Sequence, residues 1–210
     1  HAIIARDGDA ASVKLDFPLF IKPVAEGTGK GCEPSCKINN AAELATNSAR
    51  LLQRFGQPVI VEPFLPGREF TVGVLGTDAD AYTVAVMEVV LLEEAEAEIY
   101  TYHNKENFKS LVTYQLADDA AALQAADVAL AAHHALGCRD ASRVDLRCDV
   151  NGVPRFMELN PLAGIHPQHS DLPIMAKLSG MSYVTLIGRI MASALQRYNL
   201  AAPAELTHAA

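Results

Sequence analysis

The most constraining feature of this sequence is the dipeptide Asn151-Gly152, which separates two stretches rich in apolar residues. Asn-Gly is the strongest short signal for a β-hairpin, because both central residues of a two-residue turn need a positive φ. With that turn, residue 150 faces 153 and residue 148 faces 155, which sets the register of the whole ribbon. The sequence therefore predicts that Asp145 lies directly opposite Glu158.

The two faces of the predicted ribbon carry different residues, since side chains alternate between the faces of a strand. One face is apolar and is expected to be buried; it consists of Val144, Leu146, Cys148, Val150, Val153, Met157 and Leu159, interrupted by Arg155. The other face brings Asp145 and Glu158 together and places Asn160 opposite Arg143.

Two carboxylates directly across a ladder destabilise it unless a cation lies between them. Asp145, Glu158 and Asn160 offer three hard oxygen donors on adjacent strands, the ligands that Mg²⁺ (or Mn²⁺) takes alongside water and phosphate oxygens. Arg143 at the same end can meet a phosphate or a developing oxyanion. The register and these neighbours favour a metal site over the alternative, a surface hairpin whose acids are merely solvated.

Composition and charge exclude several classes of protein. The chain has 210 residues, is 50% hydrophobic and carries a formal net charge of −8, so it can form one domain or two small lobes. Without a basic stripe it is not expected to bind nucleic acid, and without an apolar run of about 20 residues it is not expected to enter a membrane. The four cysteines are scattered and predict reduced thiols in a cytoplasmic protein. The chain begins at His1 without an initiating Met, and we expect a fragment or a processed piece.

Local patterns predict two α+β lobes. Strands are expected at 2–5, 17–22, 36–38, 58–62, 69–75 and 81–92, and helices at 40–55, 120–136, 171–178 and 182–198. Asn39 or Asn40 would cap the first helix and Gly56 would end it. Residues 24–36 are expected to form a glycine-rich loop, and 93–117 a polar surface loop. A lobe boundary near 62–67 gives a partial smaller lobe (1–61), a larger lobe (62–200) and a tail (201–210).

Other candidate residues precede the hairpin. Lys22 ends a strand beside the glycine-rich loop Glu26–Gly31, whose backbone N–H groups can surround phosphates, although the loop fits neither GxxxxGK[ST] nor GxGxxG. The segment Glu62–Leu65 can present backbone groups to an adenine edge, and Glu69 can accept hydrogen bonds from a ribose. The alternatives are that Lys22 is a surface lysine, that Glu62–Leu65 is a plain connector and that Glu69 is a solvated acid.

The segment after the hairpin contains His166, His169 and Asp171. A metal site is disfavoured because Pro167 prevents a helical arrangement of the two histidines. We interpret this segment as a polar loop that contacts substrate.

Taken together, these residues resemble the ATP-grasp superfamily and, within it, the D-alanine–D-alanine ligase family. The resemblance covers about residues 15–198 and depends on the order of the matching stretches, which are Phe17–Pro23, Glu26–Thr28, Val61–Val72, Ala135–Asp140, Arg143–Asp145, Glu158–Gly164 and Ser170–Pro173. It implies an α+β protein of the ATP-grasp fold, in which two α+β lobes with antiparallel sheets clasp ATP. The N-terminal lobe of the family is absent from this chain.

The resemblance also implies roles for individual residues. Phosphates would be contacted by Lys22, Lys105 and the loop with Glu26, Gly27 and Thr28; adenine by Glu62, Pro63, Phe64 and Leu65; and the ribose by Glu69. Asp145, Glu158 and Asn160 would bind the metal ions. Arg143 and the Gly164 N–H would stabilise a tetrahedral intermediate, with Ser170 and Leu172 near the acceptor amino acid.

The implied reaction is ATP-dependent ligation of two amino acids through an acyl phosphate, which yields a dipeptide for peptidoglycan precursors in the cytoplasm. Another ATP-grasp ligase with a different acid and amine, or a non-catalytic ATP-binding fragment, are the alternatives. The chain departs from the family at Gly29, where many members carry Ser, and at Glu106, where Tyr is common. We expect the chain alone to be insufficient for ligation, and a homodimer through the absent N-terminal region is left open.

Overall fold

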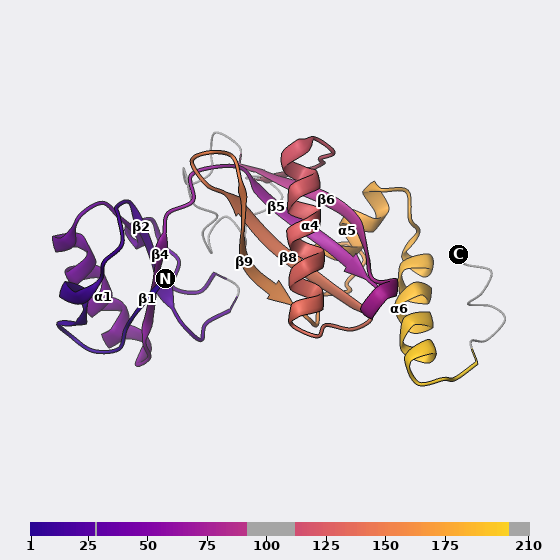
Figure 1. The fold of residues 1–210 in the computed structure, drawn as a ribbon, viewed down its shortest axis with the longest axis horizontal. Helices are drawn as coiled ribbons and strands as arrows, with labels where there is room; N and C mark the ends of the chain where they lie inside the picture. The colour runs from indigo at the N-terminus through magenta and orange to yellow at the C-terminus, as the bar shows by residue number, and fades with distance from the viewer. Residues whose placement is uncertain (28, 92–111, 202–210) are drawn as a thin grey trace. The chain divides into compact units, whose positions relative to one another are not determined.

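The computed structural model of the chain describes residues 1–27, 29–91 and 112–201. The structure is α+β (Figure 1). It has a four-stranded sheet, in the order β1-β4-β2-β3, and a five-stranded sheet, in the order β7-β6-β5-β8-β9. The chain divides into two compact units, His1–Leu65 with Leu91–Thr113 and Pro66–Val90 with Tyr114–Ala210. The two sheets are therefore described separately.

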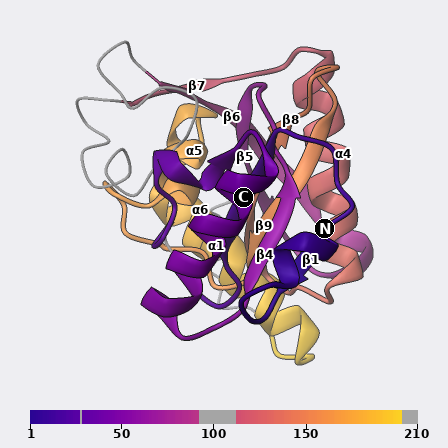
Figure 2. The same ribbon diagram turned by 90° about the vertical axis from the view of Figure 1, so that its left-hand side faces the viewer.

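The first unit contains the four-stranded sheet and one long helix. Its strands are β1 (Ala2–Ile4), β2 (Leu19–Pro23), β3 (Lys37–Ile38) and β4 (Val59–Pro63), and its helix is α1 (Ala41–Phe55), seen beside β4 in Figure 2. The three strand pairs are antiparallel. Of the two predicted caps, Asn40 is the one that caps α1, by accepting a hydrogen bond from the Glu43 N–H, and Gly56 ends the helix as predicted, with a φ of 63°. Short 3₁₀ helices occupy Asp9–Ser12 and Pro34–Cys36.

The core of the first unit lies between α1 and one face of its sheet. Leu44 and Leu51 of α1 pack there with alternate strand residues, which are Ile4, Leu19, Ile21, Ile38, Val59 and Val61. Because side chains alternate along a strand, Lys22 of β2 and Glu62 of β4 belong to the opposite face of the sheet. This alternation places two predicted site residues together on the face away from α1.

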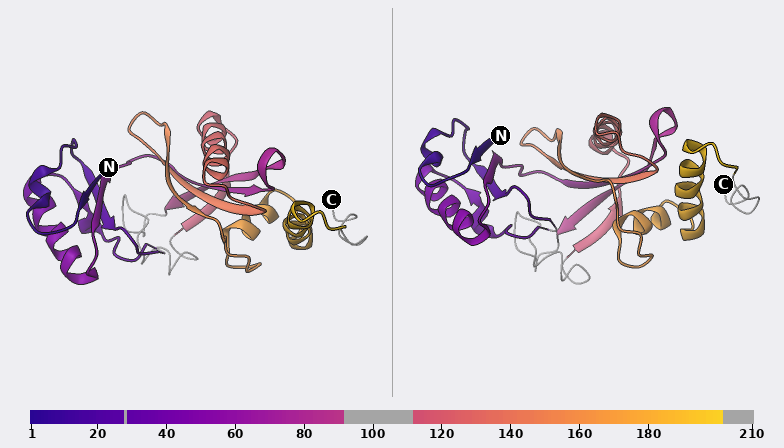
Figure 3. Two further views of the ribbon diagram at one scale, coloured as in Figure 1. Left: turned by 60° about the horizontal axis from the view of Figure 1, so that its bottom comes forward. Right: turned by 90° about the horizontal axis from the view of Figure 1, so that it is seen from below.

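The second unit is a sheet covered on both faces. Its strands are β5 (Glu69–Leu75), β6 (Tyr82–Leu91), β7 (Val112–Leu116), β8 (Ala141–Cys148) and β9 (Pro154–Asn160), and its helices are α4 (Ala120–Ala135), α5 (Asp171–Leu178) and α6 (Tyr183–Arg197). Figure 3 shows α4 on one face and α5 on the other, with α6 beside α5 at the end of the sheet. On β5, Phe70, Val72 and Val74 pack with α4, whereas Leu75 packs with α5 and α6. A 3₁₀ helix at Asp78–Asp80 lies between β5 and β6.

One predicted element is wrong. The surface loop expected over 93–117 includes a strand, β7, which lies at the edge of the sheet beside β6; the Ala117 N–H donates to the Val86 carbonyl. Among the described residues no single helix is long and apolar enough to cross a membrane. The pair α5 and α6 passes that test only jointly, by length and composition, with a bend of 114° between them.

The hairpin turn also differs from the prediction. The Gly152 N–H donates to the Asp149 carbonyl, and the Asp149 N–H donates to the Val153 carbonyl. A positive φ is adopted by Gly152, at 77°, and not by Asn151. The loop therefore has three residues, as in a type I turn followed by a left-handed glycine. The Asp149 carboxylate stabilises it by accepting from the N–H groups of Asn151 and Val153.

This longer loop changes the register next to the turn. Cys148 pairs with Pro154 instead of residue 155, and the valines at 150 and 153, expected to be buried, are 81% and 38% exposed. A bulge between Asp145 and Leu146 then shifts the pairing by one residue in the other direction. Asp145 consequently pairs with Glu158, and Arg143 with Asn160. The predicted opposition of these residues is confirmed because the two departures cancel.

Candidate functional site

The polar end of the hairpin lies on the face of the sheet that α5 covers. Across β5, β8 and β9, one row of directly paired residues is Thr71, Asp145 and Glu158, and the next row is Gly73, Arg143 and Asn160. Paired residues share a face of the sheet, and a Cβ added to Gly73 would contact Leu172 and Met175 of α5. The predicted metal and oxyanion residues are thus brought together beside α5.

Arg143 is the centre of this group. Its Nε and Nη2 donate to the two oxygens of Asp145 at 3.0 and 2.7 Å, and its Nη1 donates to Asp171 Oδ2 at 2.8 Å. Nη2 also lies 3.9 Å from Glu158 Oε1. Burial by itself would lower the pKa of Arg143, but the charges of Asp145, Asp171 and Glu158 outweigh it and raise that pKa. Three carboxylates therefore share one guanidinium.

The predicted metal ligands differ in their surroundings. Asp145 is held from a second side by the Thr71 hydroxyl, which donates to Oδ1 at 3.0 Å. The side chain of Glu158 is 49% exposed. In Asn160, Nδ2 is buried and has no hydrogen-bond partner among the described residues. The group thus combines a fixed carboxylate, an accessible carboxylate and a carboxamide with an unsatisfied atom.

The loop between β9 and α5 contains the other two predicted catalytic residues. The hydroxyl of Ser170 accepts a hydrogen bond from the His166 N–H at 3.0 Å. A Cβ at position 164 would lie 2.6 Å from this hydroxyl, so any larger residue there would require the Ser170 side chain to move. The rings of His166 and His169 are stacked with centroids 4.6 Å apart. In the described ranges, no three His, Cys, Asp or Glu side chains form a metal-binding group.

The predicted adenine segment and Lys22 lie in the first unit. Lys22 Nζ and Glu62 Oε2 form an ion pair at 2.9 Å. Pro63 ends β4, and the Phe64 N–H donates to the Pro18 carbonyl. The Lys37 ammonium lies 4.6 Å from the centroid of the Phe64 ring. The structure thus pairs the lysine expected at a phosphate with the acid expected at adenine.

The glycine-rich loop, also in the first unit, is shaped by its glycines. Gly29 and Gly31 have φ values of 72° and 86°, which disfavour a serine at position 29. Glu26 accepts a hydrogen bond from Gln57 Nε2 at 3.0 Å, and the Lys30 N–H donates to the Gly27 carbonyl. Two further predicted residues, Thr28 and Lys105, lie outside the described residues.

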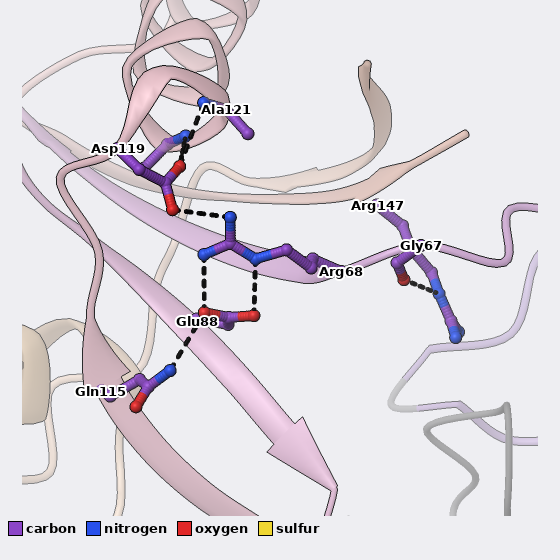
Figure 4. A network of polar contacts seen from close by, with 8 residues as sticks. Gly67, Arg68, Glu88, Gln115, Asp119, Ala121 and Arg147 are labelled. Atoms are coloured by element: carbon purple, nitrogen blue, oxygen red, sulfur yellow. Dashed lines mark hydrogen bonds and ion pairs between the residues drawn. The ribbon is translucent and has the colours of Figure 1, made fainter. Parts of the chain in front are cut away.

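The predicted ribose acceptor, Glu69, lies in the second unit and pairs across the strands with Arg147 of β8. Glu69 Oε2 lies 3.6 Å from Arg147 Nη1. The residue before it, Arg68, forms the network in Figure 4: Nε and Nη2 donate to both oxygens of Glu88, and Nη1 donates to Asp119, the N-cap of α4. Hydrogen bonding to Arg68 is the main cause of the lowered pKa of Glu88. This network fixes the start of β5, where Glu69 stands.

Sequence reasoning missed the partners of the site residues. Asp171 was interpreted as part of a polar loop, whereas the structure pairs it with Arg143. Thr71 and Arg147 were not singled out at all. Their alternation on neighbouring strands was the available signal, since residues paired with Asp145 and Glu69 must lie on the same face. That signal requires the strand order, which local patterns do not supply.

Comparison with known proteins identifies the family of this chain. Residues 7–192 match the family model described as "D-ala D-ala ligase C-terminus". The chain is 35% identical to a D-alanine–D-alanine ligase of Bordetella petrii, over 86% of this chain and 53% of the relative. It is 37% identical to one of Gluconobacter oxydans, over 87% of this chain and 58% of the relative. The chain thus spans little more than half the length of these curated relatives.

Two solved structures are similar in fold. A D-alanine–D-alanine ligase of Bacillus anthracis complexed with ATP superimposes with a TM-score of 0.66 at 22% identity, covering 94% of this chain and 60% of that one. The VanG D-Ala:D-Ser ligase of Enterococcus faecalis gives a TM-score of 0.67 at 27% identity, covering 91% and 55%. The α+β, ATP-grasp fold expected from the sequence is therefore confirmed. The chain belongs to the family defined by the C-terminal part of D-alanine–D-alanine ligases.

Proposed function

We propose that this protein is an ATP-dependent carboxylate–amine ligase, a D-alanine–D-alanine ligase or a close relative, which forms a dipeptide through an acyl phosphate. The observation that carries the proposal is the group around Arg143, in which Asp145, Glu158 and Asn160 meet at one end of two paired strands. A protein that only bound nucleotide would have little need of a guanidinium there. We place the reaction in the cytoplasm, with amino acids as substrates, and a homodimer stays a prediction.

The same residues fit a divalent cation. Three hard oxygen donors stand on adjacent strands, as Mg²⁺ prefers, and three carboxylates surround a single guanidinium. The buried Nδ2 of Asn160, which has no hydrogen-bond partner among the described residues, also supports a cation site. If the side-chain amide is rotated by 180°, its oxygen takes the place of Nδ2 and can act as a ligand. We propose that Asp145, Glu158 and Asn160 hold Mg²⁺ (or Mn²⁺). When bound, the metal would neutralise the transferring phosphoryl group.

The remaining residues are assigned from the resemblance to the ligase family. We propose that Lys22, Glu26, Gly27, Thr28 and Lys105 contact phosphates, and that adenine and ribose are held by Glu62, Pro63, Phe64, Leu65 and Glu69. The predicted lobe bounds, 1–61 and 62–200, remain part of this proposal.

The acyl-transfer step would depend on a different set of residues. Arg143 and the Gly164 N–H would stabilise the tetrahedral intermediate, where the loss of one donor typically reduces the rate by about 10²–10³. Ser170 and Leu172 would contact the acceptor amino acid. These roles suit residues whose orientation is fixed, as Arg143 and Ser170 are by their hydrogen bonds.

A different amino-acid pair is the second candidate. Its support is the likeness to the VanG D-Ala:D-Ser ligase, at 27% identity. Phosphate release from ATP, measured with a panel of D- and L-amino acids, separates the two candidates. D-alanine gives the highest rate if the first is correct, and another amino acid does so if the second is correct.

The decisive variant is Glu158→Gln, which keeps the size of the side chain and removes its charge. In the protein as the cell makes it, we expect phosphate release to fall by more than about 10²-fold, with weaker Mn²⁺ binding by electron paramagnetic resonance. Asp127→Asn, at an exposed acid of α4, removes the same charge and should change neither. Normal turnover in Glu158→Gln would contradict the metal assignment. Tight ATP binding without phosphate release in the unaltered protein would instead indicate a non-catalytic protein.

A further inference from the structure

Asp171 holds the second side of the Arg143 guanidinium. Its Oδ2 lies 2.8 Å from Nη1, whereas Asp145 takes Nε and Nη2. The side chains of Arg143 and Asp171 are only 20% and 25% exposed. Because two carboxylates bind different edges of one planar group, the guanidinium has little freedom to turn.

The position of Asp171 is set by α5. It is the first residue of this helix, which packs on β5 through the buried residues Leu172 and Met175. The two elements are in close contact at Gly73, where an added Cβ would lie 2.8 Å from Leu172 Cδ1. Gly73 is the cross-strand partner of Arg143. The helix therefore approaches the sheet at the row that carries the guanidinium.

We infer that Asp171 is a positioning residue for the proposed ligation: it fixes the angle at which the remaining N–H groups of Arg143 face the reacting acyl group. A guanidinium has five N–H donors, and the two aspartates take three of them. Ser170, the preceding residue, lies against Gly164. The start of α5 thus connects the oxyanion donor to the loop proposed to contact the acceptor. This inference rests on the proposed function.

A purely structural role for Asp171 makes a different prediction. An acid in the first turn stabilises a helix through its dipole, so its loss would lower stability and leave the turnover of the folded protein unchanged. A positioning role instead lowers kcat, because misplacement of a catalytic group by about 1 Å can reduce the rate about 10²-fold. The KM for ATP should not change, since Asp171 acts on the acyl-transfer step.

The experiment compares Asp171→Ala, Asp171→Asn and Asp171→Glu in the protein as the cell makes it, with Asp127→Asn as the matched control. Phosphate release with saturating D-alanine should fall about 10²-fold in the alanine variant and less in the asparagine variant, with partial rescue in the glutamate variant. The KM for ATP should stay within about twofold. A kcat for Asp171→Ala equal to that of the control overturns the inference.

A second measurement separates failure of the inference from failure of the proposed function. The ¹⁵N–¹H signals of the Arg143 side chain, assigned with Arg143→Lys, report directly on its hydrogen bonds. In Asp171→Asn we expect the Nη signals to broaden, while the Nε signal, held by Asp145, remains. If the unaltered protein ligates no amino acid, the proposed function fails and this spectrum still tests the pairing. Unchanged Nη signals in Asp171→Ala would refute the pairing of Asp171 with Arg143.

Discussion

Gly73 is the residue whose replacement tests this arrangement most directly. A Cβ at this position would lie 2.8 Å from Leu172 Cδ1 and 3.0 Å from Met175 Sδ, whereas carbon atoms prefer about 3.5–4.0 Å. Both neighbours are buried, so α5 must shift or its side chains must leave their rotamers, at about 1–3 kcal/mol. Alanine in a strand recovers about 0.5–1 kcal/mol of backbone entropy. We therefore expect Gly73→Ala to destabilise the second unit by roughly 0.5–2 kcal/mol.

The assay is urea unfolding followed by circular dichroism, because the chain has no Trp. Gly27→Ala is the matched control, since nothing lies within 4 Å of its added Cβ, and we expect its midpoint to stay at or slightly above that of the unaltered protein. Leu172→Ala should lower the unfolding free energy by less in the Gly73→Ala background than in the unaltered protein, with a coupling energy of about 0.5–1 kcal/mol. Two results would contradict this reasoning: additive losses of stability in Gly73→Ala and Leu172→Ala, or a Gly73→Ala variant as stable as the control. Either would mean that α5 does not pack on Gly73 and that this packing does not bring Asp171 to Arg143.

Two further predictions concern buried polar groups. Burial lowers the pKa of His133, whose Nδ1 lies 2.7 Å from the Ser142 hydroxyl. The unfolded chain therefore binds the proton first, and stability should fall as the pH drops below about 6.5 toward the lower native pKa, by at most about 1.4 kcal/mol per pH unit. This slope should be reduced in His133→Gln; equal slopes would exclude His133 as its source. Arg68→Met leaves Glu88, 11% exposed, without its bidentate partner and should lower the unfolding free energy by about 1–3 kcal/mol. Arg189→Met is its control, and equal midpoints for these two variants would contradict the network in Figure 4.

The helices could be predicted because their ends are encoded locally. Asn40 and Gly56 bound α1 through a side-chain hydrogen bond and a left-handed φ, and both effects act within one turn of the helix. The strand β7 was missed for the opposite reason. It has five residues at the edge of a sheet, so its conformation depends on pairing with β6 and not on a pattern of its own.

The hairpin shows that a correct pairing can follow from an incorrect turn. Asn-Gly favours two left-handed residues, but the Asp149 carboxylate bonds the Asn151 and Val153 N–H groups and stabilises a longer loop. The added residue is compensated by the bulge beside Asp145. Since a one-residue slip would move every side chain to the other face, the apolar residues that pack under α4 restore the register. Their burial, more than the turn, is what brings Asp145 opposite Glu158.

The contact that local patterns could not supply is that between Arg143 and Asp171, which are separated by 28 residues and belong to a strand and a helix. It forms because α5 can approach the sheet where β5 has no side chain, at Gly73. A glycine without any functional group thus decides whether Arg143, the proposed oxyanion donor, is held from one side or from two. If this is correct, substitutions at Gly73 that displace Asp171 should lower kcat, although no role in binding substrate is proposed for Gly73 itself.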